Sequence, residues 1–150
     1  HKYAAGLKVQ KSKYESFKLQ FENVVNDSVN GKMFTKIIKY DLLLDFSDIT
    51  LYNLKIISRM SPFGIGNNRP VFRTNNCSID DQLKFIGKES QIVKSKIKDQ
   101  FGNKLQFICF DKKDSLVNTN SKFDILYTVN INSFTGIEKL EITIKEISLN

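Results

Sequence analysis

The chain has 150 residues, a formal net charge of +7, 41% apolar residues and 26% charged residues, as expected for a soluble globular protein of one domain or one domain with an appendage. No apolar run approaches the ~20 residues that cross a bilayer, so no membrane partner is predicted. Cys77 and Cys109 match neither a disulfide framework nor a metal-ligand spacing, and we expect free thiols in a reducing cytoplasm.

The positive charge has two interpretations. An excess of lysine suits an acidic partner such as nucleic acid. The chain is also rich in Lys, Asn, Ile and Phe and has only two alanines, Ala4 and Ala5, a composition that follows from an A/T-rich coding sequence without selection for binding. Charge alone therefore favours nucleic acid only modestly.

The first predicted element is a helix that begins near residue 12. Ser12 and Glu15 match a capping box. Apolar residues recur at helical spacing on one face, namely Tyr14, Phe17, Phe21, Val24 and Val25. A cluster of helix-breaking residues at 26–31 predicts the end of this helix.

A strand and a second helix are predicted next, before a loop. Residues 33–46 are rich in β-forming residues and predict a strand. Asp48 or Thr50 can cap the following helix. Its apolar stripe consists of Leu51, Leu54, Ile57 and Met60. Both prolines and two of the seven glycines fall within 61–70, which predicts a linker or an ordered hinge loop.

The residues after Pro70 predict a sheet. Turn signals at 99–103 and 132–136 separate segments of β-forming residues. The predicted strands are one long, bent strand through 71–75 and 83–87, followed by 91–98, 104–110, 123–131 and 138–147. The predicted fold class is α+β: a mainly antiparallel five-stranded OB-like β-barrel preceded by a small helix–strand–helix segment.

Catalytic patterns are scarce in this sequence. The single histidine, His1, argues against a Ser/His/Asp arrangement. Asp41, Asp45 and Asp48 are close enough in sequence to suggest a metal site, but we expect structural roles, because two of them share a strand face and the third caps a helix. Gly64-Ile-Gly66 lacks the third glycine of a phosphate-binding loop.

Lysines in the predicted barrel carry the main binding signal. Lys94, Lys96 and Lys98 alternate with smaller or apolar residues, which places all three on one face. Like charges repel, so a polyanion lying across them would explain the pattern. A solvated outer face would show the same alternation. Lysines in neighbouring segments widen the patch: Lys84, Lys88 and Lys104.

Aromatic rings could add stacking contacts with bases, each worth ~1–3 kcal/mol. Phe101 and Phe134 fall in predicted turns, where packing explains an aromatic ring poorly, so both are candidate nucleic-acid contacts. Phe107 and Tyr127 alternate with apolar neighbours and are expected to point into the core.

Four segments resemble the RecJ family of DHH-type nucleases, in the same order along the chain. His1-Lys-Tyr-Ala-Ala-Gly6 is similar to the end of the Gly-Gly-His-x-x-Ala-Ala-Gly motif of the DHH-associated domain. Residues 57–72 resemble the family signature Pro-Phe-Gly-x-Gly-Asn-x-x-Pro-Val-Phe. Phe85-Ile-Gly-Lys88 resembles the Val-Gly-Lys that follows, and residues 132–147 resemble the last hairpin.

The resemblance implies two catalytic lobes that hold Mn²⁺ or Mg²⁺ and an OB domain that feeds in single-stranded DNA, which is degraded from its 5′ end. The Asp-His-His metal motif is absent from these residues, so we expect no cofactor and no nuclease activity for this chain alone. Only His1 carries over from the catalytic lobes, as a substrate contact in the intact enzyme. Arg69 and Arg73 flank the signature and are candidate phosphate contacts. Asp111 departs from the family pattern, which usually has a small residue there.

The resemblance also implies a division of the chain and its partners. Residues 1–32 would be a remnant of the DHH-associated domain, 33–70 a connecting segment, and 71–150 the OB domain. The expected partners are single-stranded DNA and the missing catalytic lobes of the same protein, in the cytoplasm, in an oligomeric state that the sequence does not set.

Two alternatives stay open beside the DNA-binding module. The barrel could mainly brace the catalytic lobes, in which case its face should carry mixed charges rather than a row of lysines. It could also be an RNA-binding OB domain, although the signature at 57–72 argues against that.

Overall fold

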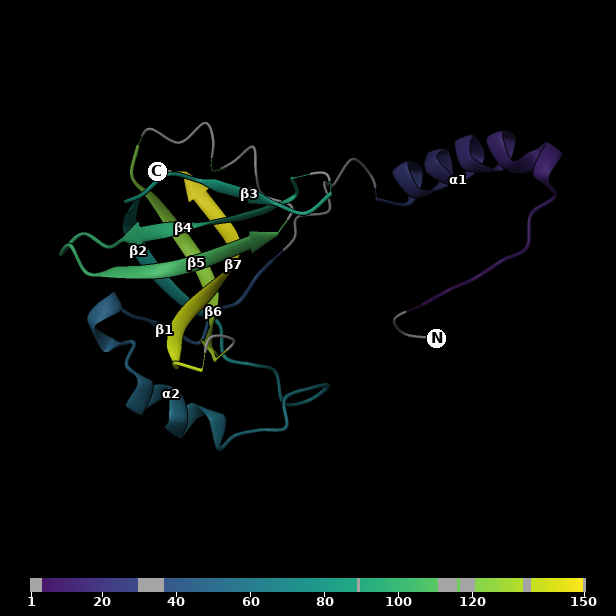
Figure 1. The fold of residues 1–150 in the computed structure, drawn as a ribbon. Helices are drawn as coiled ribbons and strands as arrows, with labels where there is room; N and C mark the ends of the chain where they lie inside the picture. Colours follow the sequence, from purple (N-terminus) through teal and green to yellow (C-terminus); the bar gives the residue numbers. More distant parts are fainter. Residues whose placement is uncertain are drawn as a thin grey trace. The chain divides into compact units, whose positions relative to one another are not determined.

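The computed structural model describes residues 4–29, 37–88, 90–110, 116, 121–133 and 136–149. The chain divides into two compact units, His1–Ile38 and Lys39–Asn150, and each is described here by itself (Figure 1). The predicted division at residues 32 and 70 stays a prediction.

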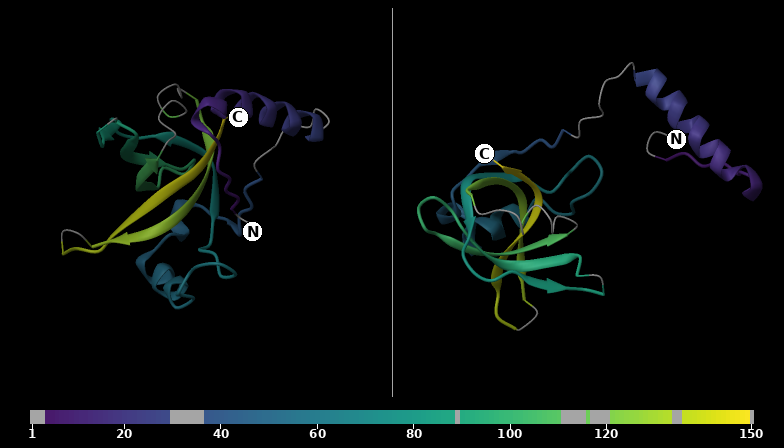
Figure 2. Two further views of the ribbon diagram at one scale, coloured as in Figure 1. Left: turned by 90° about the vertical axis from the view of Figure 1, so that its right-hand side faces the viewer. Right: turned by 90° about the horizontal axis from the view of Figure 1, so that it is seen from above.

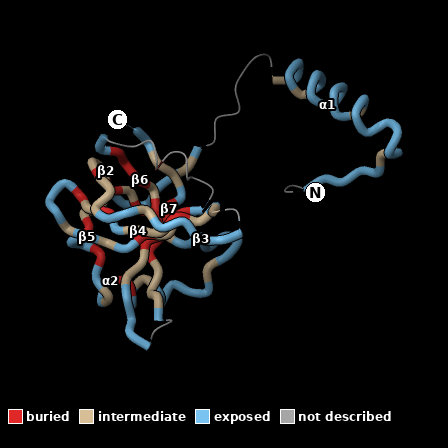
Figure 3. Tube along the Cα trace, turned by 45° about the horizontal axis from the view of Figure 1, so that its top comes forward, coloured by how far each residue is buried: buried red, intermediate tan, exposed pale blue. Residues whose placement is uncertain are grey.

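The described part of the first unit consists of an extended entry and one helix. The 3₁₀ turn η1 spans Lys11–Lys13 and leads into helix α1, Tyr14–Val29. Gln10 is the N-cap of this turn, two residues before Ser12, so the predicted capping box at Ser12 is wrong. The Lys13 N–H donates to the Gln10 carbonyl at 2.9 Å. The helix buries no residue, as its pale blue trace in Figure 3 shows.

The second unit begins with short elements where a long strand was predicted. Within the described residues 37–46, only Leu42–Leu43 forms a strand, β1, which pairs in parallel with the start of β2. The strand prediction for 33–46 is therefore wrong in this range. The Asp41 carboxylate accepts a hydrogen bond from the Val71 N–H at 2.8 Å, and the chain then turns into the 3₁₀ helix η2, Phe46–Asp48.

Helix α2, Leu51–Ser58, follows with the expected cap. The Thr50 side chain accepts from the Asn53 N–H at 3.1 Å, which satisfies one N–H group at the helix start. Leu54 is buried, and Ile57 packs against the core. The predicted stripe is too long, because the helix ends at Ser58 and Met60 is exposed.

Seven strands form one sheet, in the order β1-β2-β6-β7-β5-β4-β3. The remaining strands are β2 (Phe72–Ile79), β3 (Lys84–Ile86), β4 (Ile92–Lys98), β5 (Lys104–Phe110), β6 (Phe123–Asn132) and β7 (Lys139–Leu149). Strand β2 also pairs with β4, so β2, β6, β7, β5 and β4 make a closed circuit of hydrogen-bonded strands. In Figure 1, β4 and β5 cross β6 and β7, and Figure 2 shows the long β6–β7 hairpin.

The predicted strand count of five is wrong for two reasons. The two-residue strand β1 is too short to be recognised from a pattern. The expected long, bent strand through 71–87 is interrupted at 80–83 and divides into β2 and β3, which run in the same direction because both pair antiparallel with β4. The other predicted strands agree with β4 to β7 to within two residues at each end.

Alternate residues of the strands fill the core, shown in red in Figure 3. Phe107 and Tyr127 are buried, which confirms their predicted inward orientation. The Tyr127 hydroxyl lies 2.9 Å from the Thr74 hydroxyl, so its polar end has a partner. Cys77 and Cys109 are also buried and form no disulfide.

The β4–β5 turn is built around the Asp99 carboxylate, which is only 4% exposed. It accepts hydrogen bonds from the backbone N–H groups of Phe101 at 3.0 Å and Asn103 at 2.9 Å, and from the Asn103 amide at 3.0 Å. It also accepts from the Phe46 N–H at 3.0 Å, across 53 positions of sequence. One side chain therefore fixes the turn and ties it to η2.

Candidate nucleic-acid interface

An open groove of about 280 Å³ lies on the outer face of the sheet. It is lined by residues from the β2–β3 connection, from β3, β4 and β5, and from the end of β6 and start of β7. Its polar lining residues are Asp81, Gln82, Lys84, Lys94, Ser95, Lys96, Gln106, Asn132, Lys139 and Glu141. Four lysines and several amides thus surround one hollow.

Strand register explains why these side chains gather. In the ladder, Lys96 lies opposite Gln106, and Gln106 lies opposite Glu141. Directly opposed residues present their side chains on the same face of a sheet, about 5 Å apart. Val93, which precedes Lys94, and Ile97, which lies between Lys96 and Lys98, are buried, which confirms that the lysines share the outer face.

Carboxylates of the same chain pair with the lysines of β4. Lys94 Nζ lies 3.2 Å from Glu141 Oε1, and Lys96 Nζ lies 3.7 Å from Asp81 Oδ2. The lysine face is therefore mixed in charge. Repulsion between these two lysines is therefore relieved within the chain, by acids from other strands and loops, and does not by itself require a bound polyanion.

The Asp80 carboxylate forms ion pairs with two further lysines. Lys98 and Lys104 oppose each other at the β4–β5 turn, and their Nζ atoms lie 3.8 Å and 2.9 Å from its carboxylate. The hydrogen bond from Lys104 is the main cause that lowers the pKa of Asp80, and the charges of Lys104, Lys98 and Lys96 act in the same direction against partial burial. The carboxylate is therefore ionised at neutral pH and offsets both lysines.

Lys84 and Lys139 differ from the β4 lysines. Both are exposed at the groove, and among the described residues neither has a carboxylate within ion-pair distance. Lys84 also lies directly opposite Lys94 in the β3–β4 ladder. Like charges in opposed positions are unfavourable, so an anion bound between them would be stabilised. Lys88 is exposed but lies outside the groove lining.

The two candidate arginines lie away from this groove. Arg73 donates to Asp124 at 2.7 Å and to Asn75 at 2.7 Å, and its guanidinium lies 5.6 Å from the centre of the Tyr40 ring. The hydrogen bond to Asp124 is the main cause that raises the pKa of Arg73. These contacts give Arg73 a structural role, and a phosphate contact would have to compete with them.

Arg69 lies at the hinge loop, over the ring of Phe63 at 4.9 Å. Gly64 and Asn67 exchange backbone hydrogen bonds, and the Asn67 amide donates to the carbonyls of Met60 and Pro62. The loop is therefore held by its own hydrogen bonds and is ordered, which corresponds to the second of the two predicted forms, a linker or an ordered hinge loop.

Of the two candidate stacking rings, only Phe101 lies within the described residues. Phe101 is 67% exposed in the β4–β5 turn, but it is not a lining residue. Phe134 and His1 lie outside the described residues, so their predicted contacts stay predictions. Phe85 in β3 is also exposed, next to Lys84.

Several groove residues were not anticipated. Lys139 and the amides of Gln82, Gln106 and Asn132 carry no motif of their own, and they come together only through strand pairing. One feature of the sequence could have indicated that carboxylates lie near these lysines. The turn at 99–103 brings Lys98 opposite Lys104, and an opposed lysine pair calls for a nearby carboxylate.

The described residues contain no group of three or more His, Cys, Asp or Glu side chains that could hold a metal ion. The three acids considered as a metal site have backbone partners instead. Asp41 accepts from Val71, and Asp45 and Asp48 form a reciprocal capping box around η2. These hydrogen bonds give the acids structural roles, as expected, but not for the expected reasons: Asp41 and Asp45 lie outside β1, and Thr50 rather than Asp48 is the N-cap of α2.

A family comparison identifies the domain that carries this groove. The family model for the RecJ OB domain matches residues 40–146. The chain belongs to the RecJ OB-domain family. This match confirms the resemblance seen in the sequence, and it places the groove on the described OB domain. The described residues of this chain include no helix that is long and apolar enough to span a membrane.

Individual RecJ proteins are similar over the whole chain. The single-stranded-DNA-specific exonuclease RecJ of Bacillus subtilis (strain 168) is 23% identical over 153 residues, which cover 100% of this chain and 19% of that protein. RecJ of Thermus thermophilus in complex with Mn²⁺ matches with a TM-score of 0.63 at 13% identity, over 97% of this chain and 20% of the other. Its complex with Mg²⁺ gives 0.60 and 13%, over 95% and 21%. The chain thus spans about a fifth of these relatives.

Proposed function

We propose that this chain is the single-stranded-DNA-binding, C-terminal portion of a RecJ-like 5′→3′ exonuclease that acts in DNA repair and recombination. The observation that carries the proposal is the opposition of Lys84 and Lys94 in a groove that Lys139 also borders. OB domains bind oligonucleotides on this face, formed by their second and third strands and the adjoining loops. Here those strands are β4 and β5.

The chemistry of the groove suits a phosphate backbone more than a base sequence. Lysine ammonium groups bind phosphate as point charges and release the counterions of the nucleic acid. The amides of Gln106 and Asn132 can hydrogen-bond sugars or bases without selecting one sequence. On binding, Lys94 and Lys96 would each give up a carboxylate partner for a phosphate. The net binding free energy from each is therefore smaller than that from an unpaired lysine.

The rest of the enzyme would supply the reaction. Two-metal hydrolysis needs clustered carboxylates and histidines, and the described residues do not offer them. The Mn²⁺ or Mg²⁺ of the intact enzyme would then be held by lobes outside this chain, and the chain alone would bind DNA without cutting it.

One observation favours a second function, the bracing of the catalytic lobes. A bracing face was expected to be mixed in charge, and the pairs of Lys94 with Glu141 and Lys96 with Asp81 make this face mixed. The Lys96–Asp81 pair is exposed, and exposed ion pairs contribute little and are readily exchanged, whereas the Glu141 side chain is only 15% exposed. The mixed face therefore lowers the expected affinity for DNA but leaves the groove able to bind it.

Fluorescence anisotropy of labelled oligonucleotides distinguishes these functions. We expect the 150-residue chain to bind single-stranded DNA more tightly than duplex. The logarithm of the binding constant should fall linearly with the logarithm of salt concentration, with a slope of about −0.7 for each phosphate contacted. An RNA oligonucleotide of the same sequence tests the RNA-binding alternative. Absence of binding even at low salt would support the bracing function instead.

A further inference from the structure

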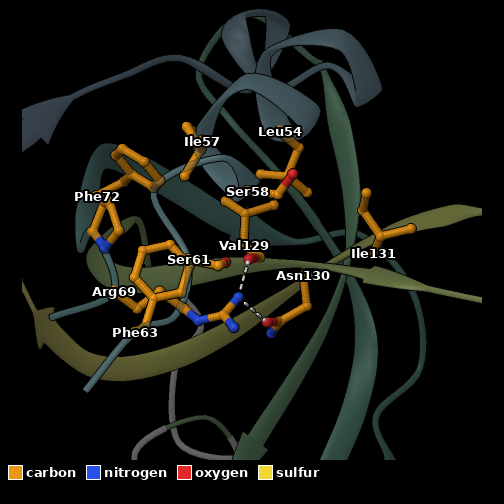
Figure 4. Close-up of a pocket in the computed structure, with 11 residues that line it drawn as sticks. Leu54, Ile57, Ser58, Ser61, Phe63, Arg69, Phe72, Val129, Asn130 and Ile131 are labelled. Atoms are coloured by element: carbon orange, nitrogen blue, oxygen red, sulfur yellow. Dashed lines mark hydrogen bonds between the residues drawn. The ribbon is translucent and has the colours of Figure 1, made fainter. Parts of the chain in front are cut away.

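A second hollow lies beside the groove, between α2, the hinge loop and β6. It has a volume of about 170 Å³. Leu54, Ile57 and Val129 form part of an apolar floor, and Arg69 and Asn130 lie at its rim. Figure 4 shows the Arg69 guanidinium beside the Phe63 ring and directed toward Asn130. A flat apolar group could enter this hollow while an attached anion meets the arginine.

Arg69 is held in place but keeps donors available. Its Nη1 donates to Asn130 Oδ1 at 2.9 Å and to the Val129 carbonyl at 3.4 Å, and its guanidinium lies 4.9 Å from the centre of the Phe63 ring. Within the described part of the chain, no carboxylate pairs with it and Nε and Nη2 have no acceptor. A guanidinium carries five N–H donors, so this exposed and preoriented cation can still bind a phosphate.

The hollow and the groove share a boundary. Glu141 borders the groove, Asn130 borders the hollow, and the two residues lie opposite each other in the β6–β7 ladder. From Lys96, the row of opposed residues runs through Gln106 and Glu141 to Asn130. Three steps of about 5 Å give a path of about 15 Å across one face.

The carboxylate of Glu141 does not close this path. Its Oε1 lies 3.2 Å from Lys94 Nζ, so a lysine charge offsets it. Beyond it, the Asn130 amide donates to the Thr143 hydroxyl at 2.9 Å and presents no charge. A polyanion leaving the groove therefore meets a neutral row and then the cation of Arg69.

We propose that single-stranded DNA continues out of the groove over β7 and β6, placing a phosphate on Arg69 and an unstacked base in the adjoining hollow. This inference rests on the proposed function and extends it by a second nucleotide subsite. An acidic peptide with an apolar side chain would fit the hollow alone. The lysine groove that leads to it favours a longer polyanion.

Oligonucleotide length tests the second subsite. Oligothymidylates of about 4 and about 12 nucleotides bracket the site size of one OB fold. In the full chain, Arg69→Ala should weaken binding of the longer one about fivefold and reduce its salt slope by about 0.7, and should leave the shorter one unchanged. Arg69→Lys should restore the slope but only part of the affinity, because an ammonium group does not stack on Phe63 as a guanidinium does.

Lys122→Ala is the matched control, since it removes one exposed positive charge at the opposite end of β6. It should leave the binding of both oligonucleotides close to that of the unmodified chain. If Arg69→Ala leaves the longer oligonucleotide unaffected while both bind, the second subsite is wrong and the groove stands, and a peptide becomes the better occupant of the hollow. If neither oligonucleotide binds, the groove and the second subsite fail together.

Discussion

Lys84→Ala combined with Lys139→Ala is expected to weaken single-stranded DNA binding roughly ten- to thirtyfold at about 0.1 M salt. These two lysines border the groove and have no carboxylate partner among the described residues. Each would otherwise contact a phosphate and release counterions, so the salt slope should also become shallower by about 1.4. Anisotropy titrations at several salt concentrations measure both effects.

A matched pair of substitutions separates the groove from the overall charge. Lys39→Ala with Lys122→Ala removes the same charge from exposed positions outside the groove lining. It should change the affinity about twofold or less, because exposed charges beyond a Debye length of about 8–10 Å are largely screened. Equal losses in both double variants would show that net charge, and not the groove, attracts DNA.

Removal of an acid that pairs with a groove lysine should have the opposite effect and strengthen DNA binding. Asp81→Asn removes the carboxylate that pairs with Lys96 at 3.7 Å and leaves that lysine available for phosphate. Affinity for single strands should therefore rise severalfold. A loss of affinity would mean that Asp81 positions Lys96 for binding rather than competing with phosphate.

Asp99→Ala is expected to destabilise the OB domain by roughly 2–4 kcal/mol, because buried N–H donors lose a charged acceptor. The substitution leaves the backbone N–H groups of Phe46, Phe101 and Asn103 without their partner. The free energy of unfolding from urea titration measures the change. Asp81→Ala, at an exposed position, is the control and should cost no more than about 0.5 kcal/mol.

The contribution of Asp99 also has a defined pH dependence. Burial alone would raise the pKa of Asp99, but the hydrogen bonds from Asn103, Phe46 and Phe101 outweigh it and lower the pKa. A carboxylate whose pKa is lower in the folded state stabilises fully above its unfolded pKa of about 3.9 and loses that effect as pH falls through the folded value. The difference in free energy of unfolding between the unmodified chain and Asp99→Asn should therefore become smaller below about pH 4. If this difference instead grows as the pH falls, the pKa of Asp99 is not lowered by folding.

The predictable part of the fold is the part with a clear local period. Strands β4 and β5 follow from alternating residues on either side of a recognisable turn, and α2 follows from Thr50 and its apolar stripe. Strand β1 has only two residues. Its existence depends on pairing with β2, which no window of sequence describes, whereas β3 was predicted within the longer strand through 83–87.

The candidate site shows the same limit. The shared face of Lys94 and Lys96 is a property of one strand and was predicted correctly. Their partners Glu141 and Asp81 belong to other segments, so the alternation of residues within β4 does not reveal them. The family signature located Arg69 but not its contact with Asn130, 61 positions away.

An NMR titration of the ¹⁵N-labelled 150-residue chain with an oligothymidylate of about 12 nucleotides tests the central claim most directly. If the groove binds single-stranded DNA, the backbone amides that shift should cluster at Gln82, Lys84, Lys94, Lys96, Gln106 and Lys139. The amides of α1 and of the buried β2 residues should change little. Shifts that leave the groove residues unchanged, or that spread evenly over all exposed lysines, would contradict the account.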